Sequence, residues 1–456
     1  MADQDQNIVL TVIDTLSAQH LPFHGYDRNT APFLTDLAEK NTYFNYSYST
    51  APWTVPSHAS IFSGELPKDH GTHTQRKKFD SNSFVEDLRD EGYTTLAFSN
   101  NDLVCDDLGY SKGFDEFTNV TQAEMWEHKG METLKQVNLR SAEGEYDSSK
   151  EKYLDVLKTS VKKADLKSIY GAAKYFLDAK RPGGRHRNFY EDNGAKVTNE
   201  LVKERLENQE DNFFMFLNFM EPHHPFAPPR DHAEKWIDDP DKAMLRHLKH
   251  YEEHGGDDYW WTGTSEEMDE EFRSLYDAEI SYIDSKIKEL YEWITSEFEN
   301  TVFYIVSDHG ECVGDYGIHG HQCGIWEKTI RVPTIVSGPE IEQKEIDQTF
   351  SLANLGDLIK GEQITKITGQ DVFAEYYGLD GLKNPEKYSE EEQKFLKNTS
   401  KSVIEEREGL VENTHLEDVT FKSHEDGKND EDIKDQDALR EKIKQKFNDI
   451  TEGIDF

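Results

Sequence analysis

The sequence predicts an α/β fold in which a mostly parallel, doubly wound sheet lies between layers of helices. Short runs of apolar and β-branched residues recur along the chain, and longer segments with helical spacing separate them. Runs of this length are typical of buried strands, and strands that alternate with helices usually pair in parallel. With 456 residues the chain is long enough for one large domain and one smaller one.

The strand pattern is clearest at the start of the chain. Residues 8–13 form a continuous run, Ile-Val-Leu-Thr-Val-Ile, that indicates a fully buried strand. Four later segments have a similar character, and we expect strands at 92–98, 213–219, 301–307 and 332–336.

The segments between these strands have helical spacing. We expect a helix over residues 31–40, with Thr30 as its N-cap and Pro32 in its first turn. Residues 120–208 are rich in Lys and Glu and contain no strand pattern, so we interpret them as a helical insertion that shapes or covers a pocket. The other expected helices are 57–62, 84–91, 268–298 and 435–447.

The charge balance excludes some classes of function. The chain has 51 Lys and Arg against 91 Asp and Glu, which gives a formal net charge of −40. Such a charge argues against a general nucleic-acid-binding protein and against a protein held to an anionic membrane surface. Because the acidic residues are spread along the whole chain, we favour a protein of a high-salt cytoplasm over an ordinary acidic protein with a charged tail.

No segment has the pattern of a signal sequence or of a membrane span. The first residues are polar and acidic, and no stretch reaches the length of about 18 apolar residues that a spanning helix needs. The three cysteines, Cys105, Cys312 and Cys323, contain no C-x-x-C pair, so we expect reduced thiols rather than disulfides or a zinc site. We therefore expect a cytoplasmic protein.

Four segments with reactive side chains lie at or beside the ends of predicted strands. Asp14 ends the first strand, Glu221-Pro-His-His-Pro-Phe226 follows the third, and Ser307-Asp-His-Gly-Glu311 follows the fourth. The fourth segment, Thr54-Val-Pro-Ser-His58, stands at the start of a helix. Taken alone, Asp14, the Thr54 segment and the His-His pair are each better explained by a structural role such as a turn or a helix cap, and the Asp-His-Gly segment is a weak signal. Because the C-terminal ends of parallel strands meet at one edge of a sheet, the four together predict one crevice.

The residue types in this crevice fit a divalent cation. Asp14, Asp308 and His309 supply two carboxylates and one imidazole. Thr54 would complete the set, because a nearby cation lowers the pKa of a hydroxyl and makes it a nucleophile. We therefore expect one divalent ion, Ca²⁺, Mn²⁺, Zn²⁺ or Mg²⁺, with Thr54 as both ligand and nucleophile.

Two histidines are candidates for contact with the substrate. We expect His223 and His321 to touch the transferring group or to protonate the leaving oxygen. The N-terminus of the helix beside Thr54 would also offer backbone N–H groups to an oxyanion. In a chain of net charge −40, the local positive potential that attracts an anionic ester would come from the metal, the imidazoles and this helix dipole.

These motifs, in this order, resemble the sulfatase family of the alkaline phosphatase superfamily. The resemblance extends from about residue 7 to about residue 378, with gaps in the helical insertion. It implies an alkaline-phosphatase-like, mostly parallel sheet flanked by helices in residues 1–340, and a smaller C-terminal sheet subdomain with a charged tail in residues 341–456. Its markers include Asp14, Thr30-Ala-Pro-Phe-Leu34, Thr54-Val-Pro-Ser-His-Ala-Ser60, Gly92-Tyr-Thr-Thr95, Pro222-His-His-Pro-Phe226, Ser307-Asp-His-Gly-Glu311 and Arg331-Val-Pro333.

The chain departs from the family pattern at positions that decide the chemistry. Where the family has paired aspartates, Asp14 is followed by Thr15. Thr54 stands where sulfatases have the Cys or Ser that is converted to formylglycine, and a threonine cannot give that aldehyde. We expect His58 and Asn100 to bind substrate. The other departures place His58 at an Arg position, Asn100 and Asp102 at Lys and His positions, and His321 at the position of an active-site Lys.

The departures favour a phosphatase-like member of the family. Asp14, Thr54, Asp308 and His309 resemble the single-metal core of superfamily phosphatases, phosphodiesterases and phosphotransferases. We find no convincing Asp-x-x-x-His pattern for a second zinc, since Asp315-x-x-x-His319 lies where the family has a variable loop. The leading hypothesis is thus a metal-dependent hydrolase or transferase of phosphate-type esters.

Two alternatives stay open. One is a sulfuric ester hydrolase that works without formylglycine. The other is a non-catalytic protein that binds a sulfated or phosphorylated glycan. In each case the expected partner is a small-molecule or glycan ester, with no nucleic acid and no membrane span.

Overall fold

The computed structural model describes residues 6–74, 77–120, 158–159, 194–251, 260–262, 264–322, 324–378, 400–405, 408–413 and 419–423. Most of the helical insertion expected over residues 120–208 lies outside this part of the chain, as does the helix expected over residues 435–447. The end of the insertion is described, and it contains the helix α9, Ala195–Leu206.

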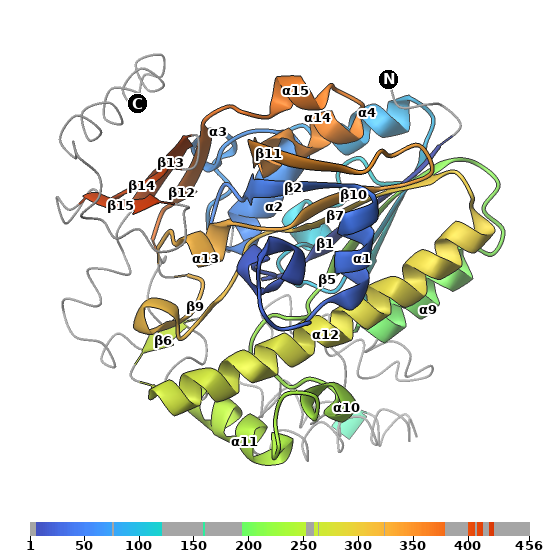
Figure 1. Cartoon of the computed structure of the whole chain (residues 1–456). Coiled ribbons are helices and arrows are strands. Elements are labelled where there is room, and N and C mark those ends of the chain that lie inside the picture. Colours follow the sequence, from blue (N-terminus) through green and yellow to red (C-terminus); the bar gives the residue numbers. More distant parts are fainter. Residues whose placement is uncertain are drawn as a thin grey trace.

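An eight-stranded sheet forms the centre of the molecule (Figure 1). Its strands lie in the order β11-β2-β10-β7-β1-β5-β3-β4, and every neighbouring pair is parallel except the two that involve β10. The predicted mostly parallel α/β sheet is therefore confirmed. The strands are β1 Asn7–Ile13, β2 Thr42–Tyr48, β3 Thr94–Ser99, β4 Glu116–Asn119, β5 Phe213–Phe219, β7 Thr301–Ser307, β10 Thr334–Ser337 and β11 Lys344–Ser351.

Helices cover both faces of this sheet. Every residue of β1 is buried, and its side chains enter the cores on the two faces alternately. Val9 and Ile13 belong to the core beneath α1, Pro32–Lys40, α9 and the long α12, Glu266–Glu297. Ile8, Leu10 and Val12 belong to the core on the other face, beneath α2, Thr54–Ser63, α4, Phe84–Asp90, and α14, Leu355–Ile359. Figure 1 shows α12 running the length of one face, with α9 beside it.

Two smaller sheets flank the large one. The four-stranded sheet β12-β13-β14-β15 is the smaller C-terminal sheet that the family resemblance implies, and it lies at one edge of the molecule in Figure 1. Because β11 still pairs with β2, this small sheet begins only at β12. The strands are β12 Val372–Tyr376, β13 Ser400–Glu405, β14 Glu408–Asn413 and β15 Val419–Ser423, and in the three-stranded sheet β6 Trp260–Thr262, β9 Ile318–Gly320 and β8 Cys312–Val313.

The remaining described α-helices are shorter than α12, and two of them, α10 and α11, pack against it. None of the helices in the described ranges combines the length and the apolar composition that crossing a membrane requires. The short helices are α3 Pro67–His70, α10 Arg230–Ala233, α11 Pro240–His250, α13 Glu327–Ile330 and α15 Ile364–Ile367.

Polar composition explains why three strands of the large sheet are not predicted. β4 and β11 are the two edge strands, where one side of the strand faces solvent and polar residues are favoured. β2 has the sequence Thr-Tyr-Phe-Asn-Tyr-Ser-Tyr, which mixes polar and aromatic residues and has no aliphatic run. A search for continuous apolar runs therefore misses all three.

Two expected helix boundaries are wrong. Thr30 is not the N-cap of α1: its hydroxyl donates to the carbonyl of His20, and Ala31 occupies the cap position. Helix α2 begins at Thr54, three residues before the expected start at residue 57. Because the early start places Thr54 in the first turn, its side chain lies at the positive end of the helix dipole.

Candidate active site

The sheet brings three of the four reactive segments to one edge. Ile13 at the end of β1 pairs with Phe219 of β5 on one side and with Ser307 of β7 on the other. The residues that follow these three strands therefore emerge side by side, as is usual for ligand sites in parallel sheets. Helix α2 is fixed to the same place, because the Ser57 hydroxyl donates to the carbonyl of Asp308 over 2.6 Å.

Asp14, Thr54, Asp308 and His309 form one buried group. His309 Nε2 lies 3.5 Å from Asp14 Oδ1, 3.5 Å from Asp308 Oδ2 and 3.3 Å from Thr54 Oγ1. The other ring nitrogen of His309, Nδ1, donates to the carbonyl of Gly310. The hydrogen bond at Nδ1 leaves the lone pair of Nε2 facing the two carboxylates.

This group has the properties of a site for a divalent cation. Asp14 Oδ1 and Asp308 Oδ2 are buried and have no hydrogen-bond partner. Burial, and then the negative charge of Asp308, raise the pKa of Asp14 well above its usual range. Burial lowers the pKa of His309 to about 4, so its ring is neutral. Two facing carboxylates with an oxygen each that accepts no hydrogen bond, together with one imidazole lone pair, form a ligand set that suits a divalent ion.

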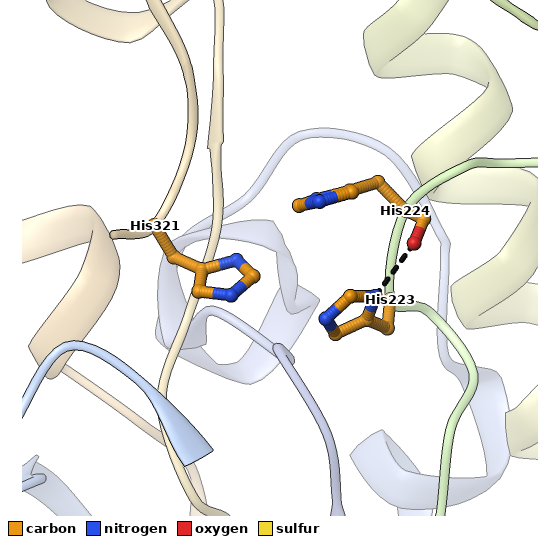
Figure 2. A group of neighbouring side chains, drawn as sticks. All are labelled: His223, His224 and His321. Atoms are coloured by element: carbon orange, nitrogen blue, oxygen red, sulfur yellow. Dashed lines mark hydrogen bonds between the residues drawn. The ribbon is translucent and has the colours of Figure 1, made fainter. Parts of the chain in front are cut away.

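A second buried group consists of three histidines, and it adjoins the first. His223, His224 and His321 each have one nitrogen within 4.8 Å of a nitrogen of the others. Figure 2 shows the three rings turned toward one another, two from the loop after β5 and one from the loop after β9. The ring centroids of His321 and His309 are 4.5 Å apart, so the histidine group and the cation group are in direct contact.

Glu311 lies behind these histidines. Its carboxylate accepts a hydrogen bond from His224 Nδ1 over 2.8 Å and one from His321 Nδ1 over 3.2 Å. The charges of His321 and His224, together with these hydrogen bonds, outweigh the effect of burial and hold the pKa of Glu311 well below its usual range. Burial, followed by the proximity of His224 and His321, holds the pKa of His223 well below its usual range as well, so that ring is neutral near pH 7.

Comparison with known proteins identifies the family of this chain. Residues 6–359 match the family model described as Sulfatase. The chain belongs to the sulfatase family. Together with the relatives described next, this makes it an ester hydrolase of the alkaline phosphatase superfamily, as the motifs predict.

Three relatives show the range of the family around this chain. The choline-sulfatase of Rhizobium meliloti (strain 1021) is 23% identical over 396 residues, which cover 77% of this chain and 68% of that protein. The arylsulfatase of Clostridium perfringens (strain 13 / Type A) is 24% identical over 349 residues, which cover 73% of this chain and 68% of that protein. The crystal structure of the phosphonate monoester hydrolase of Agrobacterium radiobacter superimposes with a TM-score of 0.66 at 15% identity, over 97% of this chain and 95% of that chain.

The structure of this sulfatase-family chain accounts for the Asp-His-Gly segment. A Cβ atom on Gly310 would stand 2.0 Å from the carbonyl oxygen of Lys328, so only glycine fits there. The backbone N–H of His309 donates to Asp308 Oδ1 over 2.8 Å. The loop thus holds the Asp308 carboxylate in one orientation, with Oδ2 toward Asp14.

Thr15 stands at the position of the family's second aspartate. Its backbone has a φ of 59°, in the left-handed region that a β-branched residue rarely adopts. In this conformation its N–H points at Asp308 Oδ1, at 3.3 Å, and its carbonyl accepts from the Tyr276 hydroxyl. Thr15 therefore supports the cation group through its backbone, while its hydroxyl is buried without a hydrogen-bond partner.

Asn101, which the motifs did not single out, contacts the cation group directly. Its Nδ2 donates to Asp14 Oδ2 over 2.6 Å, and this hydrogen bond leaves Asp14 Oδ1 facing His309. Asn100, the expected substrate ligand, accepts instead from the Thr198 hydroxyl of α9 over 3.2 Å. A contact between neighbouring loops at the ends of β1 and β3 has no signature in the sequence, and the adjacent Asn-Asn pair gives no basis for choosing between its members.

His58, the other expected substrate ligand, is fully buried behind the cation group. Its Nδ1 lies 3.1 Å from the carbonyl of Thr54 and 3.3 Å from Asp308 Oδ2. The ring also packs edge-on against Tyr110 and Phe216. In this position His58 links helix α2 to the Asp308 carboxylate.

Proposed function

We propose that this sulfatase-family hydrolase acts on phosphate-type esters through a covalent intermediate on Thr54. The observation that carries the proposal is the position of the Thr54 hydroxyl. Thr54 is the first residue of α2 and is 3% exposed. Its hydroxyl lies 3.3 Å from His309 Nε2, in the same buried group as the two carboxylate oxygens that have no hydrogen-bond partner. A threonine at this position offers a hydroxyl and cannot give the aldehyde on which formylglycine-dependent sulfate hydrolysis relies.

The cation group suits the activation of this hydroxyl. Asp14, Asp308 and His309 would hold a divalent ion whose charge lowers the pKa of the Thr54 hydroxyl and offsets the charge of an anionic ester. The chain supplies the rigidity: Asn101 orients Asp14, and the backbone of the Asp-His-Gly loop orients Asp308. The ten-residue helix α2 adds the N–H groups of its first turn, which favour a developing oxyanion.

The proposed reaction has two displacement steps. The Thr54 oxygen forms a bond to phosphorus while the bond from phosphorus to the leaving oxygen breaks, and the Thr54 proton passes to water. Water, or an acceptor alcohol in the case of transfer, then displaces Thr54. His223 and His321 come from the loops after β5 and β9, and the ring of His321 lies next to that of His309. Because a neutral His223 carries no proton to give at Nε2, we assign protonation of the leaving oxygen to water rather than to His223.

Hydrolysis of sulfuric esters is the second candidate. It is favoured by the relatives that the family comparison finds, which are named choline-sulfatase and arylsulfatase. Their identity to this chain is 23% and 24%, a range in which substrate class often changes within a fold.

A panel of aryl esters decides between the two. The purified chain is assayed with an aryl phosphate, an aryl phosphodiester, an aryl phosphonate and an aryl sulfate, each with Mg²⁺, Ca²⁺, Mn²⁺ and Zn²⁺. We expect one of the phosphorus esters to exceed the sulfate in kcat/KM by at least about tenfold, roughly 1.4 kcal/mol of transition-state stabilisation. A sulfate that is the best substrate with every metal contradicts the proposal.

A further inference from the structure

The loop after β1 bends at Thr15, directly after the carboxylate that Asp14 contributes to the cation group. Thr15 has a φ of 59°, a conformation that crowds its side chain against its own backbone. The bend points the N–H of Thr15 at Asp308 Oδ1 and lets the N–H of Leu16 donate to the Ser307 hydroxyl over 2.9 Å. The placement of Asp14 opposite Asp308 therefore depends on a conformation that threonine disfavours unless other groups hold it.

One side chain of α12 holds both sides of this bend. The Tyr276 hydroxyl donates to the carbonyl of Thr15 over 2.6 Å and accepts from the N–H of Ser17 over 3.0 Å. A hydroxyl can bind a backbone carbonyl and a backbone N–H at the same time, because it is both a donor and an acceptor. Thr15, Ser17 and Tyr276 are fully buried, so loss of the hydroxyl would deprive two buried backbone groups of a hydrogen bond each.

The packing of α12 fixes the position of the Tyr276 hydroxyl. Leu275, Tyr276 and Ile280 of this helix belong to the core on one face of the large sheet. The ring of Tyr276 also meets the ring of His20 edge-on, with 4.9 Å between the centroids. Because a close-packed core resists displacement, α12 supports the bend from outside the loop itself.

We propose that Tyr276 is a positioning residue for the cation group. Its hydroxyl holds Thr15 in the left-handed conformation, and Thr15 in turn sets where the Asp14 carboxylate stands relative to Asp308. Tyr276 acts through the backbone of the loop rather than on the ion or the substrate. The inference rests on the cation group of the proposed function, but it does not depend on which ester is hydrolysed.

This support matters because the two carboxylates of the cation group repel one another. Burial, and then the charge of Asp308, raise the pKa of Asp14. A loop that could relax would let Asp14 turn away from Asp308, and ion binding would then have to bring it back. That conformational change would take up part of the binding free energy, so the affinity for the ion would fall.

Titration with Mn²⁺ tests the inference without any substrate. The full chain is stripped with a chelator, and calorimetry gives the dissociation constant of each bound ion. Asp308→Asn identifies the ion of the cation group, because that binding event is lost when the ligand is removed. Tyr276→Phe keeps the buried ring and lacks only the hydroxyl. We expect it to bind this ion about tenfold more weakly than the parent, at the lower end of the cost usual for a group that supports a ligand.

Tyr26→Phe is the matched control, because it removes the same chemical group beside the same helix. The Tyr26 hydroxyl donates to Asp277 Oδ2 over 2.8 Å, farther along the chain than the bend at Thr15. Arg28 donates to the same carboxylate oxygen over 2.8 Å. Tyr26→Phe should therefore bind Mn²⁺ within about threefold of the parent, even if urea unfolding shows that both variants lose stability.

A glycine at position 15 separates the hold on Thr15 from other effects of the hydroxyl. Glycine adopts a positive φ without strain, so a loop with Thr15→Gly needs less support from α12. In that background, Tyr276→Phe should weaken Mn²⁺ binding by no more than about threefold. If Tyr276→Phe alone does not fold, a double variant that folds and binds Mn²⁺ supports the inference. A double variant that also fails to fold assigns Tyr276 to the fold alone and overturns it.

Three results with folded variants overturn the inference. Unchanged affinity in Tyr276→Phe shows that the contacts of Thr15 and Leu16 hold the bend without α12. An equal loss in Tyr26→Phe shows a general loosening of the loop. An equal effect of Tyr276→Phe with threonine or glycine at position 15 shows that the left-handed conformation is not what the hydroxyl supports.

The proposed function fails separately. A parent that binds Mn²⁺ with the expected dependence on Tyr276, but turns over no phosphorus ester, would leave the positioning role standing and remove the reaction assigned to Thr54. A parent that binds no Mn²⁺ would contradict the cation group itself, and the inference with it.

Discussion

Thr54 and His309 are 255 residues apart in the sequence, yet the Thr54 hydroxyl lies 3.3 Å from His309 Nε2. The contact joins the first residue of α2 to the loop after β7. Ser57 fixes it from the side by donating to the Asp308 carbonyl. A hydroxyl held this rigidly beside a cation group needs little reorganisation before it reacts, which is the basis of the first prediction.

Substitutions at Thr54 should distinguish the contribution of its hydroxyl to activity from that of the rest of the side chain. Thr54→Ala removes the proposed nucleophile, and we expect kcat for the best ester to fall by at least about a thousandfold. Thr54→Ser keeps a hydroxyl and should retain measurable activity. Acid quench of the parent during turnover of a labelled phosphorus ester should yield a peptide labelled on Thr54.

The control for these variants is another buried hydroxyl of the same helix. Ser60, on α2, is hydrogen-bonded to His70, away from the cation group, and Ser60→Ala should keep kcat within about tenfold of the parent. If Thr54→Ala hydrolyses every ester as fast as the parent, water is the nucleophile and Thr54 is not. If Thr54→Cys, co-expressed with a formylglycine-generating enzyme, gains strong arylsulfatase activity, the crevice favours sulfate instead.

Asp308→Asn should have different effects on the metal-free and metal-loaded protein. Without metal, the substitution relieves the repulsion between Asp14 and Asp308 but also removes the attraction of His309 and His58 that lowers the pKa of Asp308, so the stability of the variant should stay close to that of the parent. With metal, the parent should gain about 2.7 kcal/mol at a free ion concentration of 100 times Kd, and the variant should gain less because a ligand is lost. Thermal unfolding with and without chelator measures both effects. A variant that melts with the same metal-induced shift and turns over normally would contradict the assignment of Asp308 as a ligand.

The sequence predicts the centre of the fold better than its edges. The segments that became β5 and β7, Phe213–Phe219 and Thr301–Ser307, are predicted to the residue, because continuous apolar runs arise where a strand is covered on both faces. β11, Lys344–Ser351, is missed because an edge strand is partly exposed and its pattern is mostly polar.

The site follows the same rule. Asp14, Asp308 and His309 are predictable because each stands at the end of a predictable strand, and parallel strands end at one edge. Asn101 and Glu311 are not, because their roles depend on which way a loop turns after the strand. Glu311 accepts hydrogen bonds from both His224 and His321. This contact depends on the pairing of β8 with β9, and the spacing of these residues along the chain does not predict it.

Asp284 should make the stability of the protein depend on pH. It lies in α12 and accepts hydrogen bonds from the backbone N–H groups of Phe33 and Leu34 at the start of α1. Burial nevertheless raises its pKa to about 6. Because the folded state then binds a proton that the unfolded state has already released, this contribution to stability is present at low pH and is lost as pH rises through about 6.

The measurement compares the parent with Asp284→Asn, which cannot titrate. Between pH 5 and pH 7.5 the stability of the parent should fall relative to the variant by about 1 kcal/mol, since one pKa unit corresponds to about 1.4 kcal/mol. Urea unfolding at each pH gives both free energies, and the other titrating groups cancel in the difference. A difference that is constant with pH, or that changes in the opposite direction, would show that Asp284 is ionised throughout.

The net charge of −40 should make the folded protein require salt. Salt also weakens the favourable surface pairs, such as that between Arg205 and Glu116, but exposed pairs of this kind contribute only about 0–1 kcal/mol each. Because acidic residues outnumber basic ones, many acidic residues cannot form such a pair. We therefore expect the screening of the repulsion among acidic residues to dominate. We therefore expect the melting temperature to rise with KCl and to level off near 1 M, where the Debye length is about 3 Å. Sucrose, which is excluded from protein surfaces without screening charge, is the control and should give no comparable rise at low salt. A melting temperature that stays flat from about 0.1 M to about 2 M KCl would refute adaptation to a high-salt cytoplasm.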